Sequence, residues 1–257
     1  MRPLAELDAR RVGALLFDID DTLTTEGRLT AAAYTALERL KHAGKRVVAV
    51  TGRPAGWCDH IARMWPVDAV VGENGAFYFA FADRRLGKRL QEDAAARAAK
   101  RVLLDAIAAA ILAAVPGCAI ASDQPYRETD LAIDYCEDVP PLPLEAAERI
   151  AALMRGAGLT ARVSSIHVNG WFGAYDKLAM TRQLFAERFG QDLDAANREV
   201  VFVGDSPNDA PMFGFFAKSV GVANVGRFEA QLAAAPKYVT ARTSGAGFEE
   251  LVYHLLK

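Results

Sequence analysis

The chain has 257 residues, of which 52% are hydrophobic and 24% charged, a composition typical of a folded globular protein and not of a disordered chain. Its 30 Lys and Arg residues against 32 Asp and Glu residues leave a net charge of −2, which gives no electrostatic case for nucleic acid or an anionic membrane as a partner. The longest apolar stretch, residues 102–115, contains Asp105 and is too short to span a bilayer. Because no apolar leader is visible and the three cysteines are scattered, we expect a cytoplasmic protein with free thiols.

The first part of the chain alternates predicted strands and helices. Residues 13–17 are a short continuous apolar run, as in a strand covered on both faces. Thr30 is a suitable cap for a helix over residues 31–42, and Pro54 suits the first turn of a helix that runs to about residue 65. Further strands are predicted over residues 46–50 and 68–75, followed by a hairpin that turns at residues 83–85.

The middle of the chain has a different pattern. We predict a long alanine-rich helix over residues 93–115, strands over 118–122 and 131–136, a helix over 143–155, and one strand over 159–171. This α-β-β-α-β order, with proline-containing joints, indicates a small α+β domain inserted into the first one.

From Asp176 onwards the alternation of helix and strand returns. The predicted elements are helices over 177–189, 228–234 and 247–256 and strands over 199–205, 219–224 and 237–240. The fold class is therefore α/β, with a doubly wound, mostly parallel Rossmann-like core and the inserted α+β domain. We predict that residues 1–87 and 173–257 form the core and residues 88–172 the insertion.

Polar residues follow several of the predicted core strands. Asp18, Asp20 and Thr22 follow the first strand, and Thr51 and Gly52 follow the second. The strand near Val201 ends in a further set of polar residues, Asp205, Ser206, Asn208 and Asp209. In doubly wound sheets ligands bind at the carboxyl ends of the strands, and clustered carboxylates with oxygen-only ligands favour a hard cation such as Mg²⁺. The alternative for the first stretch alone is a solvated acidic turn.

Taken together, these stretches resemble the four motifs of the haloacid dehalogenase superfamily of phosphohydrolases. The sequence "DIDDTLT" matches the first motif, D-x-D-x-T, and "TGR" the second. Lys177 in "YDKLAMTRQL" matches the third motif and "GDSPND" the fourth, in the right order along nearly the whole chain. One departure is Asp21, at a position that is commonly glycine, which leaves the catalytic residues intact.

The place of the insertion refines this resemblance. The extra segment lies between the second and third motifs, which is similar to the Cof-like, or type IIB, subfamily, where an α/β cap covers the active site. The stretch "GENGA" at residues 72–76 is also similar to one common in that subfamily. Its known members act mainly on phosphorylated sugars and related metabolites, so the resemblance implies a small phosphorylated metabolite as the partner.

The resemblance also implies roles for the motif residues. Asp18 is expected to be the nucleophile and Asp20 the general acid and base, with Lys177 as a positive charge beside the phosphoryl group. Thr51 and the Gly52 amide are expected to bind phosphate, together with Asn208. The implied Mg²⁺ ligands are Asp18, the Asp20 backbone carbonyl, Asp205 and Asp209.

Candidate substrate contacts in the insertion are less sharply defined by the sequence. His167 and Asn169 lie on one face of a predicted strand with Trp171 close behind, and Arg127 and Asp134 are further candidates. The alternative is a polar strand satisfied by its neighbours, with a core tryptophan.

The function predicted from the sequence is a Mg²⁺-dependent phosphatase of small phosphorylated metabolites, with sugar phosphates preferred, acting through an aspartyl-phosphate. A phosphomutase of phosphomannomutase type would share the motifs and the cap. A phosphorylatable signalling module and a non-catalytic binding protein are alternatives from other classes. The oligomeric state and the physiological substrate stay open.

Overall fold

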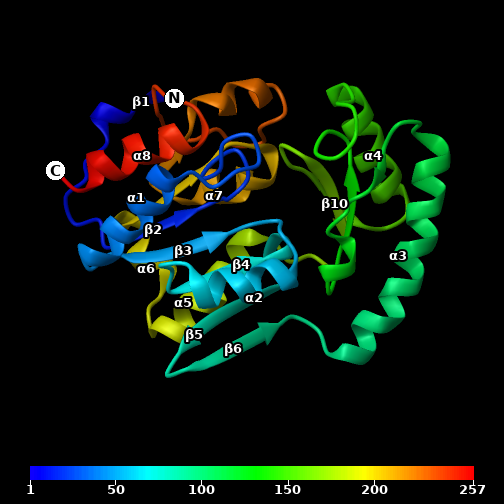
Figure 1. Ribbon diagram of the computed structural model, residues 1–257, viewed down its shortest axis with the longest axis horizontal. Coiled ribbons are helices and arrows are strands. Elements are labelled where there is room, and N and C mark those ends of the chain that lie inside the picture. The colour runs from blue at the N-terminus through cyan, green and yellow to red at the C-terminus, as the bar shows by residue number, and fades with distance from the viewer.

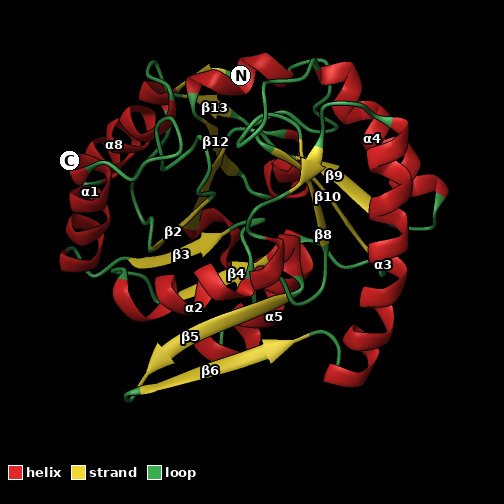
Figure 2. Ribbon diagram, turned by 45° about the vertical axis from the view of Figure 1, so that its right-hand side comes forward, coloured by secondary structure: helices red, strands yellow, loops and turns green.

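The computed structural model describes residues 1–257 and contains two β-sheets (Figures 1 and 2). The strands of the larger sheet are β1 (Arg2–Pro3), β2 (Ala14–Phe17), β3 (Arg46–Val50), β4 (Ala69–Gly72), β5 (Phe77–Ala82), β6 (Arg85–Leu90), β11 (Val200–Gly204), β12 (Lys218–Gly221) and β13 (Tyr238–Val239). The helices that flank this sheet are α1 (Ala31–His42), α2 (Ala55–Met64), α5 (Lys177–Phe189), α6 (Leu193–Ala196), α7 (Ala210–Phe215) and α8 (Ser244–Leu255).

The larger sheet has the order β1-β13-β12-β11-β2-β3-β4-β5-β6. All neighbouring strands from β1 to β4 in this order are parallel, and only β5 and β6 at one edge are antiparallel. Strand β2 is buried on both faces, because Leu15 belongs to a core cluster with α1, α2 and α8 and Leu16 to another with α5 and α7. This confirms the predicted doubly wound, mostly parallel core.

The smaller sheet belongs to the inserted segment, which forms a cap. Its elements are α3 (Ala94–Ala114), β7 (Ala119–Ile120), β8 (Leu131–Asp134), α4 (Leu144–Gly156), β9 (Thr160–Val163) and β10 (His167–Trp171). The four strands pair in the antiparallel order β7-β8-β10-β9, and the cap has a hydrophobic cluster of its own that includes Leu104, Ile133 and Ile150. Figure 1 shows α3 and α4 on the side of this sheet that faces away from the core.

Two expectations about elements were wrong. Residues 159–171 form two antiparallel strands, β9 and β10, because Ser164 closes a tight turn in which its Oγ accepts a hydrogen bond from the His167 amide at 3.0 Å. The predicted helix over residues 228–234 is replaced by a 3₁₀ helix, η6 (Ala223–Phe228), followed by turns. The alanines of this segment favour a helix only weakly, and here the chain forms turns that lead into β13.

The predicted division at residue 87 falls within β6, which pairs with β5 in the larger sheet up to Leu90. Residues 91–93 and 172–176 then join the cap to the core. The three-part division of the chain stays a prediction. None of the helices combines the length and the apolar character needed to cross a membrane.

Candidate active site

Three carboxylates meet at the carboxyl ends of two neighbouring parallel strands. Asp18 directly follows β2, Asp205 directly follows β11, and Asp209 ends the 3₁₀ helix η5 (Pro207–Asp209). One carboxylate oxygen from each of the three lies within 4.8 Å of the others, and all three residues are buried. Residues 187 positions apart in sequence are thus brought together because β2 and β11 pair in register.

Lys177 is the one ammonium group in contact with this acid cluster. Its Nζ donates to Asp18 Oδ1 at 2.9 Å and to Asp209 Oδ1 at 2.8 Å, and the side chain is buried. Burial works against the charge, but the two carboxylates outweigh it and raise the pKa of Lys177. Lys177 is the first residue of α5. Gly75, at φ +107°, packs against the backbone of the preceding residue, Asp176, and a Cβ at Gly75 would lie 2.0 Å from the Asp176 carbonyl oxygen. The glycine therefore lets the start of α5 lie close to the acid cluster.

The cluster carries more negative charge than the protein compensates. Burial raises the pKa of Asp18 to about 8, and burial together with Asp18 and Asp209 raises that of Asp205 well above its usual value. Asp205 accepts hydrogen bonds only from Thr22 Oγ1 at 3.3 Å and Asn224 Nδ2 at 3.2 Å. A buried, oxygen-only donor set with a single ammonium group for three carboxylates fits a hard divalent metal ion, so the cluster is consistent with a divalent metal site.

Asp20 lies apart from the acid cluster and pairs with Arg53. Arg53 Nε lies 3.0 Å from both Asp20 carboxylate oxygens, and Nη2 lies 2.8 Å from Oδ1. The same guanidinium also contacts Asp123 and Glu137, which belong to the cap. Sequence reasoning placed Arg53 in the second motif but gave it no role, since its partners come from distant parts of the chain.

The residues expected to bind phosphate lie around Asn74. Thr51 is buried, and its Oγ1 accepts a hydrogen bond from the Arg53 amide at 3.1 Å. A Cβ at Gly52 would lie 3.1 Å from Asn74 Nδ2, while Asn208 Nδ2 donates to Asn74 Oδ1 at 3.2 Å. Asn74 Nδ2 itself is buried with no hydrogen-bond partner, which marks a donor available to a ligand. In the sequence, Asn74 belongs to the "GENGA" stretch, and in the structure its backbone adopts φ 53°.

The cap candidates are largely engaged with other protein groups. His167 Nε2 lies 2.8 Å from Glu137 Oε2, and Asn169 Nδ2 donates to Asp130 Oδ2 at 2.9 Å. Trp171 is 1% exposed and stacks on Tyr175 with ring centroids 5.6 Å apart, which is the environment of a packing residue. Asp134 accepts three backbone N–H groups, from Cys136, Glu137 and Asp138.

Arg127 is a buried tie between the cap and the second motif. Its guanidinium contacts Asp123 at 2.8 Å and Asp130 at 3.1 Å, and its Nη1 donates to the Gly52 carbonyl oxygen at 2.9 Å. The cap and the core therefore share a polar contact directly beside the predicted phosphate site.

Glu73 makes a second tie between the two parts. Its carboxylate accepts the amide of Ala55 at the start of α2, and the amides of Glu128 and Thr129 from the cap at 2.9 and 2.7 Å. Burial raises the pKa of Glu73 to about 7, while the Thr129 and Glu128 hydrogen bonds oppose that shift. Glu73 could not be identified as a functional residue from the sequence, because its partners are mainly backbone groups, which leave no pattern in the sequence.

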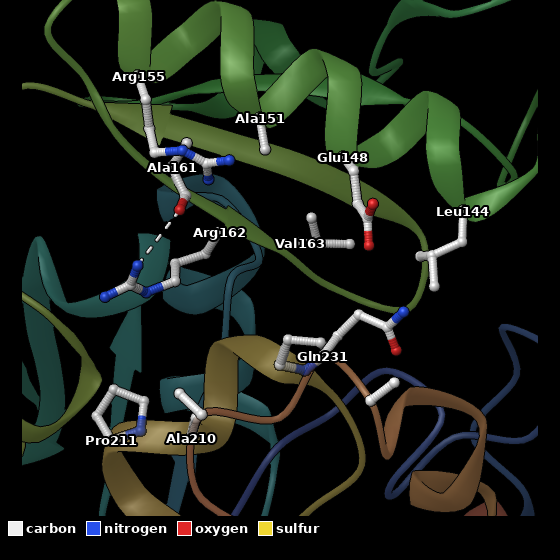
Figure 3. Close-up of a pocket in the computed structure, with 13 residues that line it drawn as sticks. Leu144, Glu148, Ala151, Arg155, Ala161, Arg162, Val163, Ala210, Pro211 and Gln231 are labelled. Carbon is white, nitrogen blue, oxygen red and sulfur yellow. Dashed lines mark hydrogen bonds between the residues drawn. The ribbon is translucent and has the colours of Figure 1, made fainter.

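A cleft of about 610 Å³ lies between the cap and the core beside the fourth motif. Figure 3 shows α4 and β9 of the cap on one side and the core residues Ala210, Pro211 and Gln231 on the other. None of the residues predicted for catalysis, metal binding or substrate binding lines this cleft. The acid cluster is thus buried beneath the cap, and the cleft is a separate gap between the two parts.

Comparison with known proteins agrees with this description. The model of the haloacid dehalogenase-like hydrolase family matches residues 15–111, which include the first two motifs. No curated protein matches the sequence.

Several solved structures share the fold over almost their whole length. A Thermoplasma acidophilum protein has a TM-score of 0.71 at 16% identity, with 95% of this chain and 98% of that chain covered. The sucrose-phosphatase of Synechocystis, solved with sucrose and phosphate, has a TM-score of 0.64 at 17% identity, with coverages of 95% and 98%. A sugar phosphatase of haloacid dehalogenase subclass IIB has a TM-score of 0.62 at 16% identity, with coverages of 94% and 98%. At these identities the likeness concerns the fold.

A mostly parallel core sheet with an inserted antiparallel four-stranded cap sheet is a haloacid dehalogenase-like fold. The chain matches the haloacid dehalogenase-like hydrolase family over residues 15–111, and the solved structures with a similar fold include sugar phosphatases.

Proposed function

We propose that this protein is a Mg²⁺-dependent phosphatase that hydrolyses small phosphorylated metabolites, with sugar phosphates as the favoured class. The observation that carries the proposal is the buried acid cluster of Asp18, Asp205 and Asp209 with Lys177 at hydrogen-bond distance from Asp18. The likeness in fold to a sucrose-phosphatase and a subclass IIB sugar phosphatase supports the choice of substrate class.

In this proposal Asp18 is the nucleophile. Its carboxylate oxygen forms a bond to phosphorus while the bond from phosphorus to the ester oxygen breaks, and Asp20 gives its proton to the departing alcohol oxygen. Water then attacks the aspartyl-phosphate, Asp20 takes the proton back, and inorganic phosphate and free Asp18 are released. Two modest barriers thus replace one high barrier.

Lys177 and the metal ligands have electrostatic roles. Lys177, 2.9 Å from Asp18, opposes the effect of burial on the pKa of this carboxyl group and holds the side chain in place. Asp18, Asp205, Asp209 and the backbone carbonyl of Asp20 would hold Mg²⁺, which would offset the charge of the phosphoryl oxygens. Thr51, the Gly52 amide, Asn208 and Asn74 Nδ2 would donate hydrogen bonds to phosphate.

The experiment is a phosphate-release screen with Mg²⁺ over hexose, disaccharide and polyol phosphates and p-nitrophenyl phosphate. We expect the wild type to hydrolyse at least one sugar phosphate and the Asp18→Asn variant to release no detectable phosphate from that substrate. Absence of phosphate release from every ester, in protein that is folded by circular dichroism, would refute the proposed activity. Equal release by wild type and Asp18→Asn would refute the nucleophile.

A further inference from the structure

Arg53 is held rigidly at the boundary between the core and the cap. Its amide donates to Thr51 Oγ1 at 3.1 Å, and its carbonyl oxygen accepts the Glu73 amide at 3.1 Å. The side chain is 4% exposed, and its guanidinium lies over the Trp57 ring, 4.4 Å from the centroid. The backbone and the aromatic ring together fix where the five N–H groups of this side chain point.

Three carboxylates from both parts of the protein share this one guanidinium. Asp20 of the core occupies Nε and Nη2, at 3.0 and 2.8 Å. Glu137 of the cap occupies Nη2 and Nη1, at 2.5 and 3.3 Å, and Asp123 of the cap lies 3.4 Å from Nη1. These charges outweigh the opposing effect of burial and raise the pKa of Arg53, so the group stays a cation.

The Asp20 carboxylate depends on Arg53 for its orientation. It accepts hydrogen bonds from Arg53 and from no other group of the protein. Asp20 lies two residues beyond Asp18 in a segment that has left strand geometry, so the backbone alone leaves its side-chain rotamer free. A general acid must lie within hydrogen-bond reach of the leaving oxygen, so the geometry of its one donor affects its efficiency.

Glu137 is in turn fixed within the cap. Its amide donates to Asp134 Oδ1 at 2.8 Å, and its carboxylate also contacts His167 Nε2 at 2.8 Å. The distance between Glu137 and Arg53 therefore reports where the cap stands relative to the core. With the cap in the position seen in this structure, the Arg53 guanidinium binds Glu137 of the cap and Asp20 of the core at the same time.

We propose that Arg53 is a positioning residue that couples closure of the cap to the alignment of Asp20, and that Glu137 is the cap residue through which this coupling acts. The inference rests on the proposed function, in which Asp20 protonates the leaving oxygen. When the cap moves away, Arg53 loses Glu137 and Asp123, its guanidinium is free to reorient, and Asp20 loses its one fixed donor. Proton donation is then efficient only beneath a closed cap.

The test uses Glu137→Gln, which keeps the shape of the side chain and removes its charge. Its kcat is measured on the best sugar phosphate of the screen, whose alkoxide leaving group needs a proton, and on p-nitrophenyl phosphate, whose leaving group needs little help. General acid catalysis contributes about 10²–10⁴-fold, so we expect at least a tenfold lower kcat on the sugar phosphate and less than about a threefold loss on the aryl ester. The matched control is Asp138→Asn, the adjacent exposed cap acid that contacts Ser122 and not Arg53, which should leave both rates unchanged.

The Asp20→Asn background separates positioning from packing. If Glu137 acts through Asp20, adding Glu137→Gln to Asp20→Asn should lower sugar-phosphate turnover by less than about twofold. Equal losses on the two esters, or the same tenfold loss in both backgrounds, would overturn the inference while leaving the phosphatase activity in place. Failure of the wild type to hydrolyse either ester would instead refute the proposed function on which the inference rests.

Discussion

The acid cluster of the core is buried, and the cap carboxylates Asp134 and Glu137 are buried and half-buried, but the two sets differ in the donors that surround them. Asp18 accepts a hydrogen bond only from Lys177, and Asp205 accepts two that are both longer than 3.1 Å. In the cap, Asp134 accepts three amides at 2.8 to 2.9 Å, and Glu137 is bound by Arg53 and His167.

The pKa values follow this difference. Burial raises the pKa of Asp18 to about 8, whereas the contacts with His167 and Arg53 overcome the partial burial of Glu137 and lower its pKa to about 2. Carboxylates short of donors mark the place where a ligand must supply what the chain lacks. The carboxylates that have several donors, Asp134 and Glu137, order the cap, and Glu137 also ties it to Arg53 of the core.

The largest effect should come from the nucleophile. We expect Asp18→Asn to lower turnover by roughly a thousandfold or more, because an amide is a far poorer nucleophile, while the unfolding temperature stays the same or rises. Initial rates of phosphate release and a thermal melt check this. Retained turnover in the variant would show that the core cluster is not the catalytic centre.

Next in size is the loss of a buried cation from the cap. Arg127→Met should lower the free energy of unfolding by about 3–5 kcal/mol, since Asp123 and Asp130 are left buried without their partner. Urea denaturation measures the change. Arg149→Met, at an exposed position on α4, is the matched control and should change it by less than about 0.5 kcal/mol. Similar small losses in both variants would contradict the structural role given to the cap network.

Added metal should stabilise the protein through the acid cluster of the core and not through the cap carboxylates. Mg²⁺ at about 100 times its dissociation constant should stabilise the wild type by about 2.7 kcal/mol, and a chelator should reverse this and abolish turnover. Asp205→Asn should remove most of the gain, whereas Glu137→Gln, outside the acid cluster, should keep it. A gain that survives Asp205→Asn would place the metal elsewhere.

The smallest expected effect is a pH dependence that comes from Glu137 of the cap. The pKa of Glu137 is lowered from 4.5 to about 2, so its ionic contacts contribute fully above pH 4.5 and are lost as the pH falls towards 2. The difference in unfolding free energy between wild type and Glu137→Gln should therefore be constant from pH 7 to about 5.5 and shrink below about 4.5. A difference that stays constant down to pH 3 would show that Glu137 is not ionically held.

Local patterns in the sequence predicted most of the strands and helices of the core. The strand over residues 13–17, the helix that begins at Lys177 and the strand that ends before Asp205 are all present, because apolar runs and helix caps are local signals. The convergence of Asp18, Asp205 and Asp209 followed from one rule, that parallel strands in a sheet present their carboxyl ends at the same edge.

The sequence predicted less where side chains form their hydrogen bonds or packing contacts with groups that only the folded chain brings near. The turn at Ser164 was missed because a serine hydroxyl bound to a backbone amide looks like any polar residue within a strand. Trp171 was predicted as a substrate contact with packing as the alternative, and its stacking on Tyr175 favours the alternative.

By itself the sequence determined the α/β class, the place of the cap and the residues of the acid cluster, because apolar periodicity and motif spacing are written along the chain. Only the tertiary structure decided that Arg53 joins Asp20 to Glu137, that Arg127 ties Asp130 to the Gly52 carbonyl, and that Glu73 binds backbone amides of the cap. Apart from the pair of Arg127 and Asp130, these contacts link residues 33 to 84 positions apart. The partner of a buried charge is set by how the cap folds onto the core, and no local pattern in the chain records it.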